Sequence, residues 1–152
     1  MQLHVTSNNP ALSAERLWEN PIRARKMIVE TQQLIACAQI EFGHIHLIRK
    51  TDGSYFKTGW KHHPVCKWVC ANEKHLLWCV EYLEELYKRY SGPGFNNVRN
   101  NIDIVKSQIH TRNYEGITFL NFAKSKAKGL DFTDRGVFEA YNKYLEAQGE
   151  PK

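Results

Sequence analysis

The sequence predicts a mainly α-helical protein, in which residues 1–152 form a compact, single-domain helical bundle with a small β-hairpin insertion. Three observations predict it. Apolar residues recur at three- and four-residue steps, most clearly between Glu73 and Tyr90. Asn-Pro and His-Pro pairs precede several of these stretches, as expected where helices begin. A chain of 152 residues, 42% of them hydrophobic, can bury one core without disulfides or metal ions.

The first part of the chain predicts an extended arm and two helices. Apolar and polar residues alternate over 1–9, which is typical of a short strand or an extended segment. Ser13 is the expected N-cap of a short helix at 11–19. Asn20-Pro21 supplies a capping side chain followed by proline at the first helical position, so a long helix is expected over 22–42.

The middle of the chain predicts a hairpin followed by two further helices. Residues 45–56 alternate and contain the turn pair Asp52-Gly53, so the hairpin is expected there. His63-Pro64 ends this segment and starts the next helix, because the residue before a proline prefers extended geometry. Asn72 is expected to cap or kink the chain before the strongest helix, at 73–90.

The last third of the chain has a weaker pattern. Ser91-Gly92-Pro93-Gly94 ends the preceding helix. A loop region is expected to carry helices around 101–110 and 118–128. Thr133 is the expected cap of a final helix at 134–146.

The charge balance permits a polyanionic partner. The chain has 21 basic and 16 acidic residues, a formal net charge of +5. Lys124, Lys126 and Lys128 form a basic cluster near Arg112, for which a solvated surface is the ordinary interpretation. No apolar run approaches the ~20 residues of a membrane span, and the N-terminus has no secretory signal pattern. We therefore expect a cytoplasmic protein with no membrane partner.

The cysteines are expected to be reduced core thiols. Cys66 and Cys70 are one helical turn apart and His62 is one turn earlier, so a metal-binding face is geometrically conceivable. None of the four cysteines forms a CxxC pair, however, and standard zinc spacings are missing. We expect no metal and no other cofactor.

A carboxylate on the long helix is the main candidate for chemistry. Glu30 falls within an apolar stripe, where an isolated charge is costly. One side of the helix carries a polar row made of Arg23, Lys26, Glu30 and Gln33. A carboxylate flanked by cations can accept a proton or stabilise a cation at a site for a phosphorylated substrate. The simpler alternative is a structural Lys26–Glu30 pair.

The segment from Trp60 to Trp68 is the second candidate. Aromatic rings interleaved with Lys67, His62 and His63 suit base stacking together with phosphate binding. The two histidines lie at a junction between loop and helix, where backbone donors are also available. The structural alternative is that Trp68 fills the core and Trp60 packs beneath the hairpin.

Four segments resemble a widespread phage family of small proteins. They are ARKMIVETQQLI, HHPVCKWV, ELYKRY and FEAYNKYL, in the order in which they occur. The family carries a K-M-x-x-E-x-x-Q helix, an N-H-P-x-x-x-W-V segment, an E-Y-x-x-R-Y helix and a C-terminal A-Y-R-x-Y. The matches span most of the chain between Arg23 and Leu145.

More distantly, the layout resembles the phage pyrimidine dimer DNA glycosylases of the endonuclease V type. That resemblance implies a compact helical domain whose N-terminal amine attacks the sugar C1′, with an essential glutamate on a long helix. Glu30 stands at the place of that glutamate. The family has a histidine seven residues earlier, where this chain has Arg23. The resemblance implies an amine nucleophile, which here is Met1 or else Lys26.

Two functions follow from these residues. The first is a DNA N-glycosylase, with or without abasic-site lyase activity, that acts on a modified or damaged base. Its catalytic residues would be Glu30 with Lys26 or Met1. The second is a phage nucleotide-binding protein that sequesters or degrades a nucleotide signal of host defence. In both, the partner is nucleic acid or a phosphorylated nucleotide, held by a common set of residues. They are Arg23, Gln33, Trp60, His62, His63 and Lys67.

Overall fold

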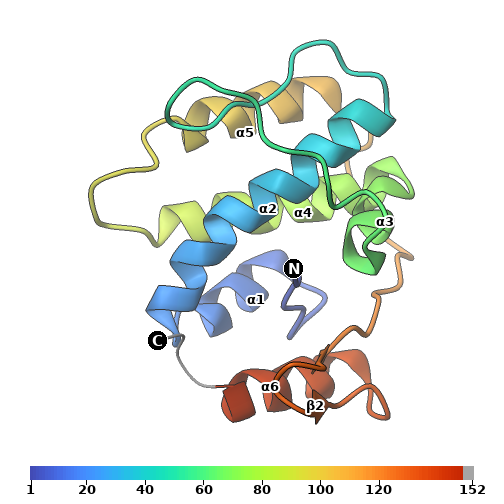
Figure 1. The fold of residues 1–152 in the computed structure, drawn as a ribbon. Helices are drawn as coiled ribbons and strands as arrows, with labels where there is room; N and C mark the ends of the chain where they lie inside the picture. Colours follow the sequence, from blue (N-terminus) through green and yellow to red (C-terminus); the bar gives the residue numbers. More distant parts are fainter. Residues whose placement is uncertain (149–152) are drawn as a thin grey trace.

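The computed structural model describes residues 1–148, and within this range six helices and one two-stranded antiparallel hairpin occur (Figure 1). The helices are α1 (Pro10–Leu17), α2 (Pro21–Glu41), α3 (Pro64–Cys70), α4 (Glu73–Lys88), α5 (Val98–Gln108) and α6 (Val137–Gln148). The strands are β1 (Lys124–Ser125) and β2 (Leu130–Asp131). The mainly α-helical fold class with a small hairpin is thus confirmed. None of the helices in residues 1–148 combines the length and the apolar character needed to cross a membrane.

Helix α4 lies at the centre of the bundle. It contacts α1, α2, α3 and α5, and its buried side chains include Trp78, Tyr82 and Leu83. Such a helix is apolar around much of its circumference because neighbours cover several of its faces. The long helix α2 crosses it and contributes Met27, Leu34 and other buried residues to the same core.

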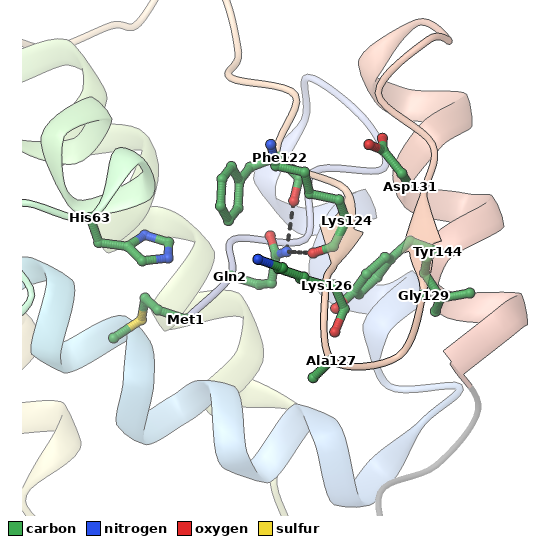
Figure 2. A pocket seen from close by; sticks show the side chains of 12 residues that line it. Met1, Gln2, His63, Phe122, Lys124, Lys126, Ala127, Gly129, Asp131 and Tyr144 are labelled. Atoms are coloured by element: carbon green, nitrogen blue, oxygen red, sulfur yellow. Dashed lines mark hydrogen bonds between the residues drawn. The ribbon is translucent and has the colours of Figure 1, made fainter.

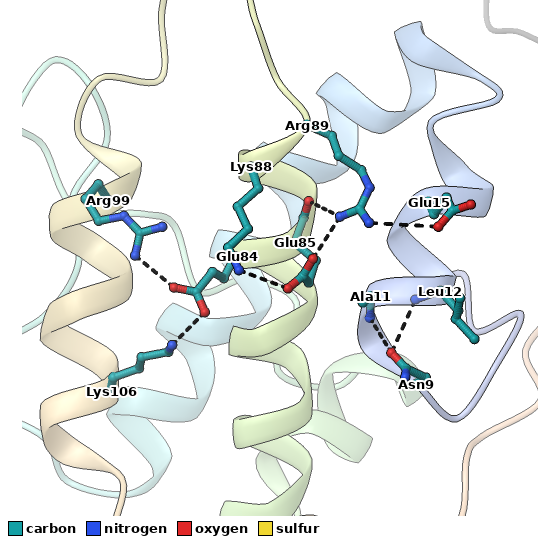
Figure 3. A network of polar contacts seen from close by, with 10 residues as sticks. All are labelled: Asn9, Ala11, Leu12, Glu15, Glu84, Glu85, Lys88, Arg89, Arg99 and Lys106. Atoms are coloured by element: carbon teal, nitrogen blue, oxygen red, sulfur yellow. Dashed lines mark hydrogen bonds and ion pairs between the residues drawn. The ribbon is translucent and has the colours of Figure 1, made fainter.

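Polar contacts join α4 to its neighbours on two sides (Figure 3). Glu84 accepts hydrogen bonds from Arg99 at 2.8 Å and Lys106 at 2.6 Å, both on α5. Burial alone would raise the pKa of the Glu84 carboxyl, but these bonds outweigh it and hold the pKa below its ordinary value. On the other side, Arg89 lies 4.0 Å from Glu15 of α1.

The start of α1 differs from the expected one. Oδ1 of Asn9 accepts hydrogen bonds from the backbone N–H groups of Ala11 at 2.8 Å and Leu12 at 3.3 Å, so Asn9 is the N-cap. The expectation for Ser13 was wrong, because its hydroxyl is buried and donates to the carbonyl of Ser7 at 2.9 Å. Proline at the first helical position explains the earlier start.

The other helix starts follow the sequence more closely. Helix α2 begins at Pro21 as predicted, although the side chain of Asn20 caps nothing and instead accepts a hydrogen bond from Arg16 at 3.4 Å. His63 caps α3, and Asn72 caps α4 by accepting from the N–H of His75 at 3.0 Å. Helix α5 begins three residues earlier than the predicted 101–110.

The predicted hairpin at 45–56 is reduced to one isolated bridge between Arg49 and Tyr55. The turn at Asp52-Gly53 does form, with Gly53 at φ +84°. The strand beside it does not continue, because side chains at the start of α5 form hydrogen bonds with its backbone. The carbonyl of Arg49 accepts from Asn97 at 2.6 Å and from Asn101 at 2.8 Å. These long-range bonds are not visible in the local sequence pattern.

The predicted helix at 118–128 was also wrong. This segment is extended and leads into β1, and the turn to β2 ends at Gly129, which has φ +67°. Helix α6 likewise starts at Val137 and not beside Thr133. The Thr133 hydroxyl instead donates to Asp131 at 2.5 Å, which ends the hairpin.

Candidate active site

The N-terminal arm is held in place by the side chain of Gln2. Its amide nitrogen donates to the carbonyls of Phe122 at 2.7 Å and Lys124 at 3.1 Å. Its oxygen accepts a hydrogen bond from the hydroxyl of Tyr141 at 3.0 Å. Leu3, the next residue, is buried in the core. Met1 therefore has a defined position between the hairpin segment and α2 (Figure 2).

The N-terminal amine of Met1 faces Glu30. Its nitrogen lies 3.9 Å from Oε1 of the carboxylate, whose side chain is 33% exposed. Helix α2 positions Glu30, because Met27 and Thr31 on its adjoining face are buried. Within residues 1–148, no ion pair joins Glu30 to Lys26, so the structural pair considered above does not form.

His63 lies beside this amine. As the N-cap of α3, its Nδ1 accepts a hydrogen bond from the N–H of Val65 at 3.2 Å. Burial, and secondly the positive charge of the N-terminus, lower the pKa of His63 below its ordinary value. The ring is therefore neutral at neutral pH. Since Nδ1 accepts, Nε2 carries the proton and is a hydrogen-bond donor.

A pocket of about 750 Å³ opens beside Met1 and His63 (Figure 2). Its size lies within the range of ordinary small-molecule sites. Its other walls come from the segment that contains the hairpin and from α6. The side chains that line these walls include Phe122, Lys124, Lys126 and Tyr144. The ring of Phe122 meets His63 edge-on, with the two centroids 5.0 Å apart.

The hairpin makes one wall of the pocket cationic. Lys124 and Lys126 are exposed, and neither forms an ion pair in the described part of the chain. Asp131 lines the same wall, but Thr133 donates hydrogen bonds to its carboxylate, which lower the pKa of Asp131. Two lysines against one aspartate leave a local surplus of positive charge.

Arg23 adds a further cation near the N-terminus, beside a buried histidine. The ring of His4 is 2% exposed, and neither of its nitrogens has a hydrogen-bond partner among residues 1–148. Burial lowers the pKa of His4 to about 3, with smaller contributions from Arg23, the N-terminal charge and Arg16. His4 is therefore a neutral ring that packs against Tyr144, which lines the pocket.

The remaining predicted residues fall into three groups. Trp60 is 41% exposed and adjoins the site through His63, with the ring centroids 5.8 Å apart. His62 and Lys67 are exposed at and beyond the start of α3 and do not line the pocket. Lys26 and Gln33 also lie outside it, and Lys26 lines a different groove. The structure thus brings together Met1, Glu30, His63 and, more loosely, Trp60 and Arg23.

Sequence reasoning missed the hairpin wall and the Gln2 anchor. The cluster of Lys124, Lys126 and Lys128 stands out in the sequence, but its ordinary interpretation is a solvated surface. Its spacing of two residues and the following Gly129 are typical of a strand and turn, and this signal could have found the wall. The long-range contacts of Gln2 leave no trace in the local sequence.

The cysteines do not form a metal site with His62. Cys66 and Cys70 have their sulfurs 4.0 Å apart, and all four cysteines are free. In the chain up to residue 148, no group of three or more His, Cys, Asp or Glu side chains is arranged to hold a metal ion.

Comparison of the chain with protein family models, with curated proteins and with solved structures finds no match.

Proposed function

We propose that the protein is a DNA N-glycosylase with abasic-site lyase activity, in which the Met1 amine is the nucleophile and Glu30 the acid–base group. The observation that carries this proposal is the 3.9 Å separation between that amine and the Glu30 carboxylate at the edge of a cationic pocket. The resemblance to pyrimidine dimer glycosylases supports the same pair of residues. An amine that can pass a proton to an adjacent carboxylate is a general arrangement for covalent catalysis.

The chemical step needs only these two groups. The nitrogen of Met1, in its neutral form, attacks C1′ of the target nucleotide, and the bond between C1′ and the base breaks. The base leaves with the bonding electron pair. Glu30 takes the proton that the attacking nitrogen loses and can return one to the departing base. As its carboxylate, it also stabilises the cationic character that develops at C1′.

Imine formation then accounts for the lyase step. Opening of the sugar ring converts the nitrogen–C1′ adduct to an imine, and the ring oxygen receives a proton to become a hydroxyl. The imine acidifies the C2′ hydrogen. Loss of that proton to a base such as Glu30 expels the 3′ phosphate by β-elimination.

The pocket supplies the means of holding an extruded nucleotide. Lys124 and Lys126 of the pocket wall provide positive charge for phosphates, and Arg23 adds a cation near the N-terminus outside the lining. Nε2 of neutral His63 provides a hydrogen-bond donor. Trp60, 41% exposed beside His63, provides a ring on which a base can stack.

The second candidate is capture of a phosphorylated nucleotide without turnover. The pocket of about 750 Å³ and its two hairpin lysines favour it, because both suit a single nucleotide. This function needs the cations and rings but no amine nucleophile and no proton transfer by Glu30.

Glu30→Gln separates the two candidates. The glycosylase should lose turnover by at least about 100-fold while it keeps its affinity for DNA, because the amide retains the shape but cannot take a proton. Glu41→Gln, at the exposed C-terminal end of the same helix, is the matched control. Base release is measured on DNA with damaged bases, and affinity on the same duplexes. Unchanged base release by Glu30→Gln would contradict the proposed chemistry.

A further inference from the structure

A second groove lies beside α2, apart from the pocket at Met1. Its volume is about 550 Å³. One wall is the N-terminal half of α2, and the other is the connection between α4 and α5. Thr51, from the loop after α2, also lines the groove. None of the residues that line it is acidic.

The wall formed by the connection carries two aromatic rings. Tyr90 and Phe95 meet edge-to-face, with centroids 5.0 Å apart. Phe95 has φ +53°, in the left-handed region that residues other than glycine rarely adopt. The hydroxyl of Tyr90 donates to the carbonyl of Pro93, which fixes the connection in this form. A strained bulky residue at the edge of a groove often marks a binding site.

The wall formed by α2 carries cations and apolar side chains together. Arg25 and Lys26 are exposed, and neither forms an ion pair or side-chain hydrogen bond within the described residues. Ile22 and Val29, one turn before and one turn after these cations, also line the groove and are 42% and 37% exposed. The groove therefore presents positive charge, aliphatic surface and aromatic faces, and its lining residues include no carboxylate.

We propose that this groove binds one nucleotide unit, with its base against Phe95 and Tyr90 and its phosphate between Arg25 and Lys26. An aromatic heterocycle joined to an anionic group is complementary to both walls at once. The proposal concerns binding only, so it does not depend on the chemistry at Met1. The nucleotide can belong to a single strand or be free, because both offer the same base and phosphate.

Binding of fluorescein-labelled hexathymidylate, followed by anisotropy, tests the proposal on the intact chain. Phe95→Leu removes the ring but keeps an apolar side chain, and Arg25→Ala removes one cation. Lys74→Ala is the matched charge control, because Lys74 is at the opposite end of α4, about 20 Å away along the helix axis. Thermal unfolding of each variant verifies that it is folded.

We expect Phe95→Leu to weaken binding by about fivefold or more at every salt concentration, because the loss is one of stacking. Arg25→Ala should weaken it mainly at low salt and reduce the slope of log K against log salt by about 0.7. Lys74→Ala should leave the affinity for hexathymidylate nearly unchanged. If both groove variants bind like Lys74→Ala, or if the wild type does not bind the oligonucleotide, the proposal is overturned.

Competition distinguishes the two sources of the nucleotide. Thymidine monophosphate that displaces the oligonucleotide at concentrations where inorganic phosphate does not would identify a site for free nucleotides. Displacement by unlabelled hexathymidylate but not by the mononucleotide would identify a site for a strand. Equal displacement by inorganic phosphate and the mononucleotide would overturn recognition of the base.

Discussion

The N-terminal nitrogen of Met1 lies 3.9 Å from Oε1 of Glu30, although one belongs to the terminal arm and the other to the middle of α2. Neither residue reaches this position by local structure alone. Gln2 ties the arm to the chain around Phe122, and buried neighbours set the rotation of α2. The tertiary fold therefore brings the pair together. Substitutions that displace the N-terminal arm or rotate α2 should lower the proposed activity.

Gln2→Ala should lower base release without unfolding the protein. The substitution removes the three hydrogen bonds that locate Met1, and small displacements of a nucleophile cost about 10- to 100-fold in rate. We expect the loss in kcat and not in KM, since the pocket lysines remain. Gln108→Ala is the control, because it also loses side-chain hydrogen bonds but lies away from the pocket. Equal kcat values for the two variants would show that Gln2 does not position the amine.

The hairpin lysines should differ in their contribution to DNA binding. Lys124 and Lys126 line the pocket, whereas Lys128, on the same turn, does not. Each alanine substitution at the first two should reduce the slope of log K against log salt by about 1, the value for one phosphate contact. Lys128→Ala should change the slope much less. Salt titrations of binding to one duplex give the slope for each of the three variants. Slopes identical to that of the wild type would show that the hairpin lysines do not contact DNA phosphates.

His4 should destabilise the folded protein in acid. Its pKa is about 3 in the folded state against 6.5 when exposed, so protonation is costly only in the folded state. Stability is unaffected above pH 6.5 and falls as the pH decreases from 6.5 toward 3. The full loss from this group is on the order of 5 kcal/mol.

His4→Phe tests this by removing the titrating ring. Neither nitrogen of His4 has a hydrogen-bond partner in residues 1–148, so no bond is lost. Urea unfolding between pH 7 and pH 4 should show a smaller decrease in the free energy of unfolding for this variant than for wild type. His62→Ala, at an exposed position, should follow the wild type. If the free energy of unfolding depends on pH in the same way for wild type and His4→Phe, a lowered pKa of His4 is contradicted.

Two buried tyrosines should respond oppositely to loss of their hydroxyls. The hydroxyl of Tyr82 is buried without a hydrogen-bond partner in the described chain, whereas that of Tyr141 donates to Gln2 at 3.0 Å. Tyr82→Phe should be neutral or stabilise the fold by about 1 kcal/mol, and Tyr141→Phe should destabilise it by about 1 kcal/mol. Urea unfolding of the pair measures both. A large destabilisation by Tyr82→Phe would show that its hydroxyl is satisfied.

Local signals in the sequence predicted the starts of α2, α3 and α4. Pro21, Pro64 and Asn72 mark helix starts, because proline geometry and side-chain caps act within a few residues. The apolar stripe of α4 likewise predicted which of its side chains are buried. The hairpin was misplaced because Asn97 and Asn101 take the carbonyl of Arg49, a competition between segments far apart in the chain.

The site could be predicted only in part, for the same reason. Glu30 stood out because a carboxylate interrupts an apolar stripe, and His63 because it precedes a proline. Their proximity to Met1 depends on Gln2. One hydrogen-bond partner of Gln2, Phe122, is 120 residues away in the sequence. Lys26, chosen for its one-turn spacing from Glu30, lines another groove and forms no ion pair with Glu30 within residues 1–148.

Borohydride trapping on DNA with abasic sites tests the amine–Glu30 chemistry most directly. Hydride reduces the imine to a stable amine, and mass spectrometry of the peptides identifies the nitrogen that carries the sugar. We expect an adduct on the Met1 peptide that persists in Lys26→Ala and disappears when the Met1 amine is acetylated. An adduct on Lys26, or no adduct on DNA that the protein binds, would contradict this chemistry.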